Sequence, residues 1–389
     1  MIENIQILNF KSIIKTNLDL GNINVFIGEN GCGKTNILEA IAMLSASKDN
    51  NLNINGLSSR GVRVTKPSLT MSSFIGERQK NEIELSAKFS TDEGFIKCCL
   101  LPVDINDIYS DWKDKNTNAL VDMFDEALKN KMKDIDLEKL LSDKNQFTDT
   151  FKEVFFSNIP EKRTYLTKFL IYNLNTQSLR GILNISKEIP LGINGEGLDL
   201  LLHDFSNDEW AELRKYNYLI DWLDDIIVDD ADTLKYKGHK LGRSSSFLYF
   251  KDKFMRKNNN VFAAENSNEG VLSILFYLAL FISKKTPKFF AIDNIETSLN
   301  PKLCRTLMTI LSDLSIQKKK QALITTHNPA ILDGLNLFDN NQRLFVVKRT
   351  DDGNTKVERI KLKPQVEGKE LKLSEMWMRG YLGGLPNNF

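Results

Sequence analysis

The segment at residues 28–36 constrains the fold of this chain more than any other. It reads Gly-Glu-Asn-Gly-Cys-Gly-Lys-Thr-Asn and contains Gly-x-x-x-x-Gly-Lys-Thr, the phosphate-binding P-loop pattern. The apolar, β-branched run at residues 23–27 precedes it, as expected of a buried strand. Residues 37–44 follow with the periodicity of a helix. A strand, a glycine-rich loop and a helix form the context that this motif requires, so the sequence predicts nucleotide binding.

The residue types of the loop each have a chemical reason. Glycines allow a tight turn in which successive N–H groups point at a phosphate, and the N-terminus of the next helix adds a partial positive charge. We expect Lys34 to reach the β- and γ-phosphates of ATP, and Thr35 to hold Mg²⁺ through its hydroxyl. The predicted ATP-binding residues of the loop are Gly28, Glu29, Asn30, Gly31, Cys32, Gly33, Lys34, Thr35 and Asn36.

The composition is that of an ordinary globular protein. The chain has 389 residues, of which 41% are hydrophobic and 26% charged, enough for two domains or one large one. Its formal net charge of +1 gives no support for strong non-specific DNA binding. The four cysteines suit neither a zinc site nor a disulfide framework, which predicts a cytoplasmic location. No signal peptide is visible, and the most apolar run, residues 271–282, is too short to span a bilayer, so we expect no membrane association.

The hydrophobic pattern divides the chain into residues 1–104, 105–184 and 185–389. The first part alternates as strands do, and short connections predict antiparallel pairing. Its predicted strands are residues 1–10, 13–20, 23–27, 69–75, 82–89 and 94–101, with a loop over 46–68. The middle part is charged, and its apolar residues recur every four positions, which predicts a small helical insertion.

The last part alternates buried strands and helices, as a parallel sheet requires. A turn over residues 194–198 should lead into a short helix, and an amphipathic helix is expected over 208–227. The predicted strands are residues 247–250, 260–264, 288–293, 321–326, 343–347 and 356–362, and the predicted helices are 270–284, 301–314 and 373–381. The helix at 270–284 is apolar nearly all round and should be buried.

Two strand ends carry polar residues suited to ATP chemistry. The strand at residues 288–293 ends in Asp293, as in a Walker B element whose aspartate holds Mg²⁺. The next strand is followed by Thr326 and His327. A lone histidine is usually a structural residue. The carboxyl ends of parallel strands face the ligand crevice, however, and that position favours a functional role for His327.

Two further segments admit both a structural and a functional reading. Ser267-Asn268-Glu269-Gly270 is typical of a helix N-cap. The same helix start also suits a γ-phosphate held by a second subunit. Asn9-Phe10-Lys11-Ser12 ends the first strand, and a solvated turn explains it as well as a role for Lys11 near the phosphates does.

Together these pieces resemble the ABC-type ATPase heads of the RecF, SMC and Rad50 group, and residues 28–41 look most like RecF. The resemblance covers residues 1–100 and 185–350. It implies an α/β fold, an ABC-type P-loop ATPase head with a mixed β-sheet core, an antiparallel β subdomain and a small helical insertion. It further implies that Ser267 and Gly270 touch ATP across a homodimer closed over two ATP molecules. Thr297-Ser298-Leu299-Asn300 matches the D-loop, His327 the γ-phosphate switch, and Lys11 a basic residue near the phosphates.

One departure from that family concerns the catalytic carboxylate. Related heads often have Asp-Glu at the end of Walker B, where the glutamate polarises the attacking water. This chain has Asp293-Asn294, with Glu296 two positions further on. Either Glu296 supplies the base, or hydrolysis is slow by design. We favour slow hydrolysis from the sequence alone. A third reading is that Asn294 points elsewhere.

The motifs show no effector chemistry of their own. We therefore expect a slow ATPase that acts as an ATP-gated dimeric sensor or clamp. Its partner would be a separate effector protein, a nuclease or toxin from the same operon, as in the compact ATPases of bacterial anti-phage systems that the chain resembles. One alternative is a RecF-like repair ATPase that binds DNA directly. Another is an ATP-binding scaffold with little hydrolysis.

Overall fold

The computed structural model describes residues 1–76, 80–90, 95–116, 161–183, 190–240, 242–362 and 371–385. Its centre is a six-stranded sheet in the order β14-β13-β3-β12-β11-β7. The pairs within it are parallel except for β13 and β14, which are antiparallel. The strands are β3 (Ile23–Ile27), β7 (Ile171–Tyr172), β11 (Phe289–Ile292), β12 (Gln321–Thr325), β13 (Gln342–Arg349) and β14 (Thr355–Ile360). The mixed α/β fold predicted from the sequence is confirmed.

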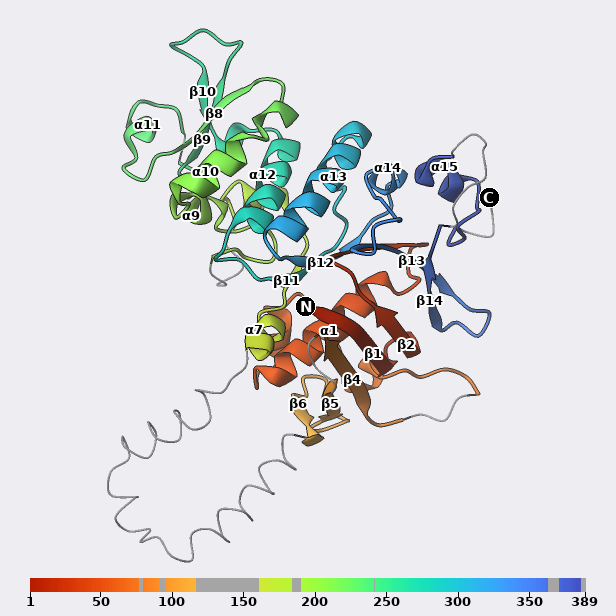
Figure 1. Ribbon diagram of the computed structural model, residues 1–389. Coiled ribbons are helices and arrows are strands. Elements are labelled where there is room, and N and C mark those ends of the chain that lie inside the picture. The colour runs from red at the N-terminus through yellow and green to blue at the C-terminus, as the bar shows by residue number, and fades with distance from the viewer. Residues whose placement is uncertain are drawn as a thin grey trace, which may run out of the picture.

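This sheet separates two hydrophobic cores, because alternate residues of its strands point to opposite faces. On one face the P-loop helix α1 (Lys34–Lys48) packs with a five-stranded antiparallel sheet in the order β2-β1-β4-β5-β6. On the other face lie α12 (Glu269–Ile282) and α13 (Pro301–Gln317). Figure 1 shows these layers stacked above and below the central sheet. The strands of the second sheet are β1 (Ile2–Phe10), β2 (Ile13–Asp19), β4 (Ile83–Phe89), β5 (Phe95–Pro102) and β6 (Trp112–Asp114).

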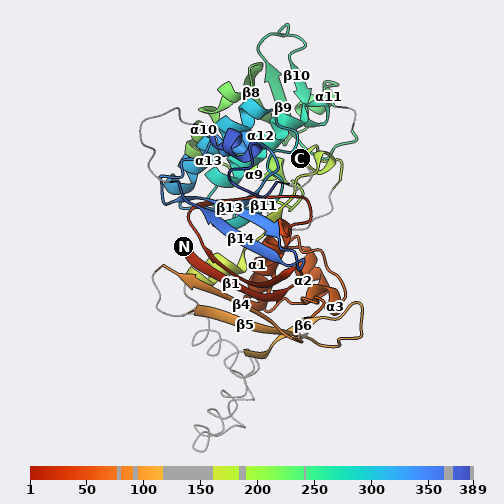
Figure 2. The same cartoon turned by 90° about the vertical axis from the view of Figure 1, so that its right-hand side faces the viewer.

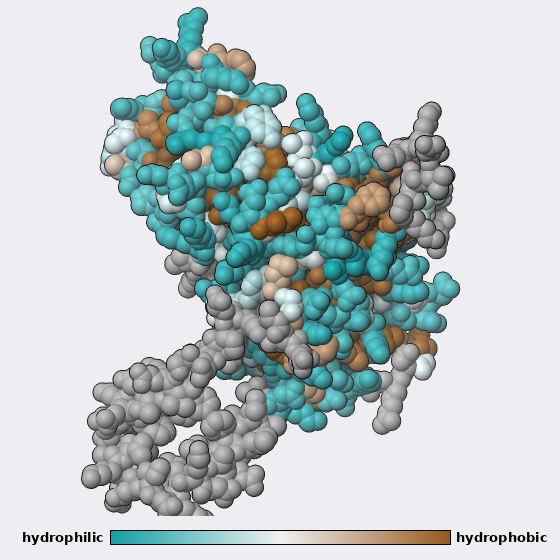
Figure 3. Space-filling model, in the orientation of Figure 1, coloured by the Kyte–Doolittle hydropathy of each residue, from teal (hydrophilic) through white to brown (hydrophobic). Residues whose placement is uncertain are grey.

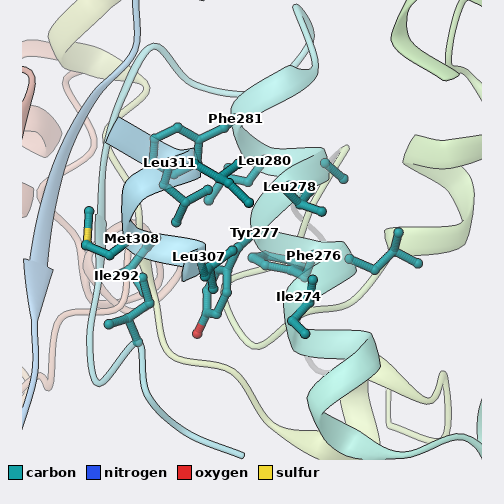
Figure 4. Close-up of a cluster of buried hydrophobic side chains, with 14 of the residues drawn as sticks. Ile274, Phe276, Tyr277, Leu278, Leu280, Phe281, Ile292, Leu307, Met308 and Leu311 are labelled. Atoms are coloured by element: carbon teal, nitrogen blue, oxygen red, sulfur yellow. The ribbon is translucent and has the colours of Figure 1, made fainter. Parts of the chain in front are cut away.

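The predicted burial of the helix near residue 270 is confirmed, since all of α12 after its first residue is buried. Figure 4 shows its side chains, including Phe276 and Tyr277, next to Leu307, Met308 and Leu311 of α13 and Ile292 of β11. A helix that is apolar all round has no solvent face, so its start can be placed firmly against neighbouring elements. The polar residues gather outside, and hydrophilic side chains cover most of the face seen in Figure 3.

A small third sheet has the order β10-β9-β8. Its strands are β8 (Leu223–Val228), β9 (Leu248–Asp252) and β10 (Val261–Ala263). The remaining helices are α2 (Ile54–Ser58), α3 (Pro67–Thr70), α7 (Glu161–Thr167), α8 (Thr176–Leu179), α9 (Leu198–His203), α10 (Asn207–Arg214), α11 (Thr233–Tyr236), α14 (Pro329–Leu332) and α15 (Leu373–Met378). Among the described residues, no helix combines the length and the apolar character that crossing a membrane demands.

Three sequence predictions of secondary structure are wrong. Residues 69–75 form no strand, because Pro67 starts α3 and only Met71 bridges Phe10. The helix predicted over 208–227 ends at Arg214, since the β-branched residues of β8 pair with β9 instead. The predicted loop over 46–68 holds the end of α1 and α2.

The predicted helical insertion at 105–184 contains two short strands within its described residues. β6 pairs with β5, and β7 extends the central sheet beyond β11. The four-residue repeat that suggested helices lies outside the described residues. The C-terminal helix α15 lies within the helix predicted over 373–381 and packs on α14, with Leu373 and Trp377 in the core.

Candidate nucleotide-binding site

The P-loop turns between β3 and α1 in a conformation that requires glycine. Gly28, Gly31 and Gly33 have φ angles of 149°, 75° and 109°, a region that side chains with a Cβ avoid. A methyl group on Gly28 would lie 2.0 Å from the carbonyl oxygen of Val347, and one on Gly33 would lie 2.3 Å from Thr355 Oγ1. The loop is therefore held tightly between the start of α1 and strands β13 and β14.

The ammonium of Lys34 lies over this loop. Its Nζ donates hydrogen bonds of 2.9 Å each to the carbonyl oxygens of Gly28 and Glu29. Burial lowers the pKa of Lys34, whereas the neighbouring Cys32, Asp293 and Glu296 act in the opposite direction. Burial also raises the pKa of the Cys32 thiol, so this cysteine is a small apolar filler of the loop.

The structure brings Thr35 and Asp293 together, although 258 positions separate them in the sequence. Thr35 Oγ1 lies 3.0 Å from Asp293 Oδ2 and 3.4 Å from Oδ1. Thr325, at the end of β12, donates a second hydroxyl hydrogen bond to the same carboxylate. A hydroxyl and a carboxylate side by side are the oxygen ligands that Mg²⁺ prefers, with phosphates and water completing its octahedron. The donor set fits Mg²⁺ bound with a nucleotide.

Asn294, Glu296 and His327 meet at the neighbouring strand ends. Asn294 has a φ angle of 57°, so the chain leaves β11 in a sharp turn. Its backbone N–H donates to Thr325 Oγ1 at 2.9 Å. Glu296 Oε1 accepts a 2.8 Å hydrogen bond from the backbone N–H of His327, and its Oε2 is buried with no hydrogen-bond partner among the described residues.

The His327 side chain is exposed. Partial desolvation and the nearby Lys34 charge lower its pKa, while Glu296 and Asp293 oppose that shift. A neutral imidazole next to Lys34 can both donate and accept a hydrogen bond, as a residue that senses a phosphate requires.

The segment from Ser267 to Gly270 starts α12. Asn268 is the N-cap and accepts a 2.8 Å hydrogen bond from the Gly270 N–H, so the structural reading of this segment is correct. Ser298 Oγ donates to Glu269 at 3.1 Å, and a methyl group on Gly270 would lie 2.8 Å from the Ser298 carbonyl oxygen. The segment thus packs on the D-loop-like residues. Within the described residues, no hydrogen bond connects it to the P-loop.

Lys11 lies beside α1, where it binds a buried carboxylate. Glu39 is fully buried, and Lys11 Nζ donates to its Oε2. Arg63 Nε donates to Oε1 at 2.7 Å. Burial lowers the pKa of Lys11, and the hydrogen bond to Glu39 raises that of Arg63. Lys11 is therefore one of two cations held by Glu39, and its predicted approach to the phosphates stays a prediction.

The sequence analysis missed several residues around the P-loop. A cavity of about 470 Å³ next to the loop is lined in part by Lys11, Ser12, Asn36, Arg63 and Arg349. Ser12 Oγ lies 2.7 Å from both Asn36 Nδ2 and Thr355 Oγ1, and Thr355 Oγ1 donates to Cys32 O at 2.7 Å. Arg349 Nε donates to Gly31 O at 3.1 Å. Arg349 and Thr355 carry no local motif, so no sequence signal pointed to them.

Comparisons with known proteins agree with this geometry. A family described as an AAA ATPase domain matches residues 1–192. A second AAA-domain family, whose description names the AbiEii toxin and a type IV TA system, matches residues 174–333. Over 48 residues the chain is 44% identical to the DNA replication and repair protein RecF of Clostridioides difficile (strain 630). That match spans 12% of this chain and 13% of the relative, so the chain matches about one eighth of RecF's length.

A solved structure of TM-score above 0.5 shows the same fold at low sequence identity. A crystallised SMC head, bound to the C-winged helix domain of ScpA, superposes with a TM-score of 0.53 at 16% identity. The superposition covers 93% of this chain and 98% of that one. The SMC head domain from Thermotoga maritima has a TM-score of 0.49 at 11% identity and covers 93% and 99%.

The fold is the ABC-type P-loop fold seen in SMC ATPase heads. The two family models together cover residues 1–333. The matches therefore relate both parts of the chain to AAA ATPase domains, and its fold is similar to that of a RecF/SMC-like ABC ATPase head.

Proposed function

We propose that this protein binds ATP and Mg²⁺ at the P-loop and hydrolyses ATP as the switch of a dimeric, ATP-gated sensor or clamp. The observation that carries the proposal is the contact between Thr35 and Asp293, which unites the two predicted magnesium ligands from distant parts of the chain. The buried ammonium of Lys34 lies at the same loop and supplies a charge for phosphate.

We propose that Glu296 is the general base for ATP hydrolysis. The alternative is slow hydrolysis without a base, with Asn294 at the catalytic position. The Asn294 amide can hold a water but cannot take its proton, whereas a carboxylate can do both. Glu296 is held through one oxygen by His327, and its other oxygen is buried without a partner among the described residues. This oxygen has unused hydrogen-bonding capacity, and Lys34 and Asp293 lie within electrostatic reach of the same site.

The dimeric part of the proposal depends on the start of α12. In a single subunit the helix N-terminus at Ser267–Gly270 has no hydrogen bond to the P-loop among the described residues. A two-fold arrangement would give each helix start the phosphate of the other subunit. Ser267 is only 2% exposed, so it would contribute mainly through its backbone, together with the exposed Asn268 and Glu269.

The biological role proposed is anti-phage defence in the cytoplasm with a separate effector. The second matching family bears the name of a toxin–antitoxin system, which favours a two-component arrangement. Direct DNA binding in repair is the second candidate, and the short match to RecF favours it. The third candidate is an ATP-binding scaffold, and a low rate of ATP hydrolysis would distinguish it from the first two.

Equilibrium titration with a fluorescent ATP analogue tests the site. Lys34→Ala should weaken binding at least tenfold while thermal unfolding stays cooperative. Lys168→Ala, at a position not used by the site, is the control. Wild-type affinity in Lys34→Ala would refute the site.

Light scattering with a non-hydrolysable analogue tests closure. Wild type should dimerise. Glu269→Arg should stay monomeric with unchanged ATP affinity, and Glu84→Arg on the outer sheet is the control. A protein that stays monomeric at every nucleotide state, alone and with its neighbouring gene product, would refute the dimer.

A further inference from the structure

A second polar pocket lies away from the P-loop, where the two large sheets meet. It has a volume of about 510 Å³. Its floor is the polar face of the antiparallel sheet, and its wall comes from β13 and β14, which Figure 2 shows directly above β1 and β4. The lining residues are Glu3, Asn4, Gln6, Asn17, Asp19, Lys88, Phe95, Arg343 and Arg359. Neither the ATP chemistry nor the packing of the cores uses these side chains.

Two guanidinium groups in this pocket have buried donors without acceptors. Arg343 Nη1 and Arg359 Nε are shielded from solvent and have no hydrogen-bond partner within the described part of the chain. Among the described residues, neither arginine forms an ion pair, and neither does Lys88, which also lines the pocket. Burial and the positive charge of Arg359 lower the pKa of Arg343, while Asp19 and Glu3 oppose that shift. Leaving such donors unpaired is costly, and an oxyanion would satisfy both.

The same pocket also contains a buried hydrogen-bond acceptor without a donor, and two acidic side chains. Asn4 is 9% exposed, and its Oδ1 is buried without a partner, while its Nδ2 donates to Asp19 Oδ1 at 2.8 Å. Asp19 and Glu3 lie on the side of β1 and β2. An amide oxygen next to carboxylates suits an ammonium group. These acids would also repel a continuous polyanion, so a nucleic acid fits the pocket poorly.

We propose that this pocket binds a small zwitterion, with a phosphate or carboxylate on Arg343 and Arg359 and an ammonium on Asn4 and Asp19. The two unpaired donors determine where the anionic group of the ligand binds, and the unpaired acceptor determines where its ammonium binds. The volume admits a molecule of metabolite size. Because β13 continues to Val347, whose carbonyl lies against Gly28, a ligand here would contact the same strand that holds the P-loop.

Isothermal titration with phosphoethanolamine tests the proposal on protein saturated with a non-hydrolysable ATP analogue and Mg²⁺, which keeps the P-loop occupied. Glycerol 3-phosphate, of similar size but without the amine, should bind at least fivefold more weakly. Arg343→Gln and Arg359→Gln should each weaken phosphoethanolamine binding at least tenfold, while Arg379→Gln on the surface should not. Asp19→Asn should remove the preference for the amine without abolishing phosphate binding.

Three results would overturn the proposal. One is the absence of saturable binding of phosphoethanolamine and of glutamate, the carboxylate probe, to wild type. Another is equal affinity for both phosphates in wild type and in Asp19→Asn. The third is a combination of two observations: phosphoethanolamine does not bind, and both arginine variants lose affinity for a DNA duplex. That combination would make the pocket a nucleic-acid contact. Circular dichroism of each variant separates loss of binding from loss of the fold.

Discussion

The backbone N–H of His327 donates a 2.8 Å hydrogen bond to Oε1 of Glu296. This bond joins the turn after β11 to the turn after β12. It holds the Glu296 carboxylate while Oε2 remains without a partner among the described residues. His327, the proposed phosphate sensor, and Glu296, the proposed base, are thus connected by a direct hydrogen bond, so a displacement of one turn should displace the other.

The first prediction concerns this base. Glu296→Gln should slow single-turnover ATP hydrolysis by about 10²–10⁴-fold, because the amide cannot accept the proton of the attacking water. Nucleotide affinity should change little, since Gln keeps the acceptor for the His327 amide. Asn294→Glu is the informative partner variant. If it accelerates hydrolysis while Glu296→Gln is unaffected, the catalytic position is 294, and wild type is slow by design.

The second prediction concerns the buried carboxylate of α1. Glu39→Ala should lower the free energy of unfolding by about 3–5 kcal/mol, because Lys11 would remain as a mostly buried cation without its carboxylate. Urea unfolding measures the change. Glu375→Ala removes the exposed pair with Arg379 and should change stability by less than about 1 kcal/mol. Equal effects of the two substitutions would contradict this account of Glu39.

The third prediction concerns pH and Lys320. This side chain is 2% exposed and donates to Thr286 Oγ1 at 2.7 Å. Burial lowers its pKa from 10.5 to about 7. The unfolded chain therefore binds more protons between these values, and stability contributed by this group should rise as the pH increases from about 7 to 10.5.

Urea unfolding of wild type and Lys320→Met from pH 7 to pH 9.5 measures that contribution. The difference in stability between them should shift in favour of wild type as the pH rises. Two curves that run parallel over the whole range would mean that Lys320 titrates as in the unfolded chain.

The fourth prediction concerns the C-terminal segment at the P-loop. A methyl group on Gly384 would lie 2.7 Å from Val346 Cγ1 and 3.4 Å from the Cα of Gly28. Gly384→Ala should therefore push the segment off the loop, destabilise the protein by about 1–3 kcal/mol and weaken ATP binding. Gly383 has nearly the same φ angle, 74° against 73°, and nothing near its Cβ position. If Gly383→Ala has the same effect on ATP binding, backbone strain is responsible rather than contact with Gly28.

Local patterns predicted five of the six strands of the central sheet, and missed the two-residue strand β7. The apolar runs before Gly28 and Asp293 formed β3 and β11, and the apolar run after Gly270 formed the buried helix α12. Prediction failed where the pattern was ambiguous. The apolar residues of 208–227 fit a helix, but pairing with β9 decided the structure of the last part. Proline at position 67 outweighed the apolar run that follows it.

The sequence by itself determined the P-loop, its flanking strand and helix, and the order of the ATPase motifs. These depend on residues adjacent in the chain, where glycine freedom and side-chain periodicity act locally. Only the tertiary structure decided that Thr35 meets Asp293, that Lys11 is held by Glu39, and that Glu296 is the carboxylate beside His327. The contacts of Thr35 and Glu296 arise because parallel strands bring distant segments to one edge of the sheet. The contact of Lys11 with Glu39 arises because α1 packs against the antiparallel sheet. The spacing of these residues in the sequence does not predict either kind of contact.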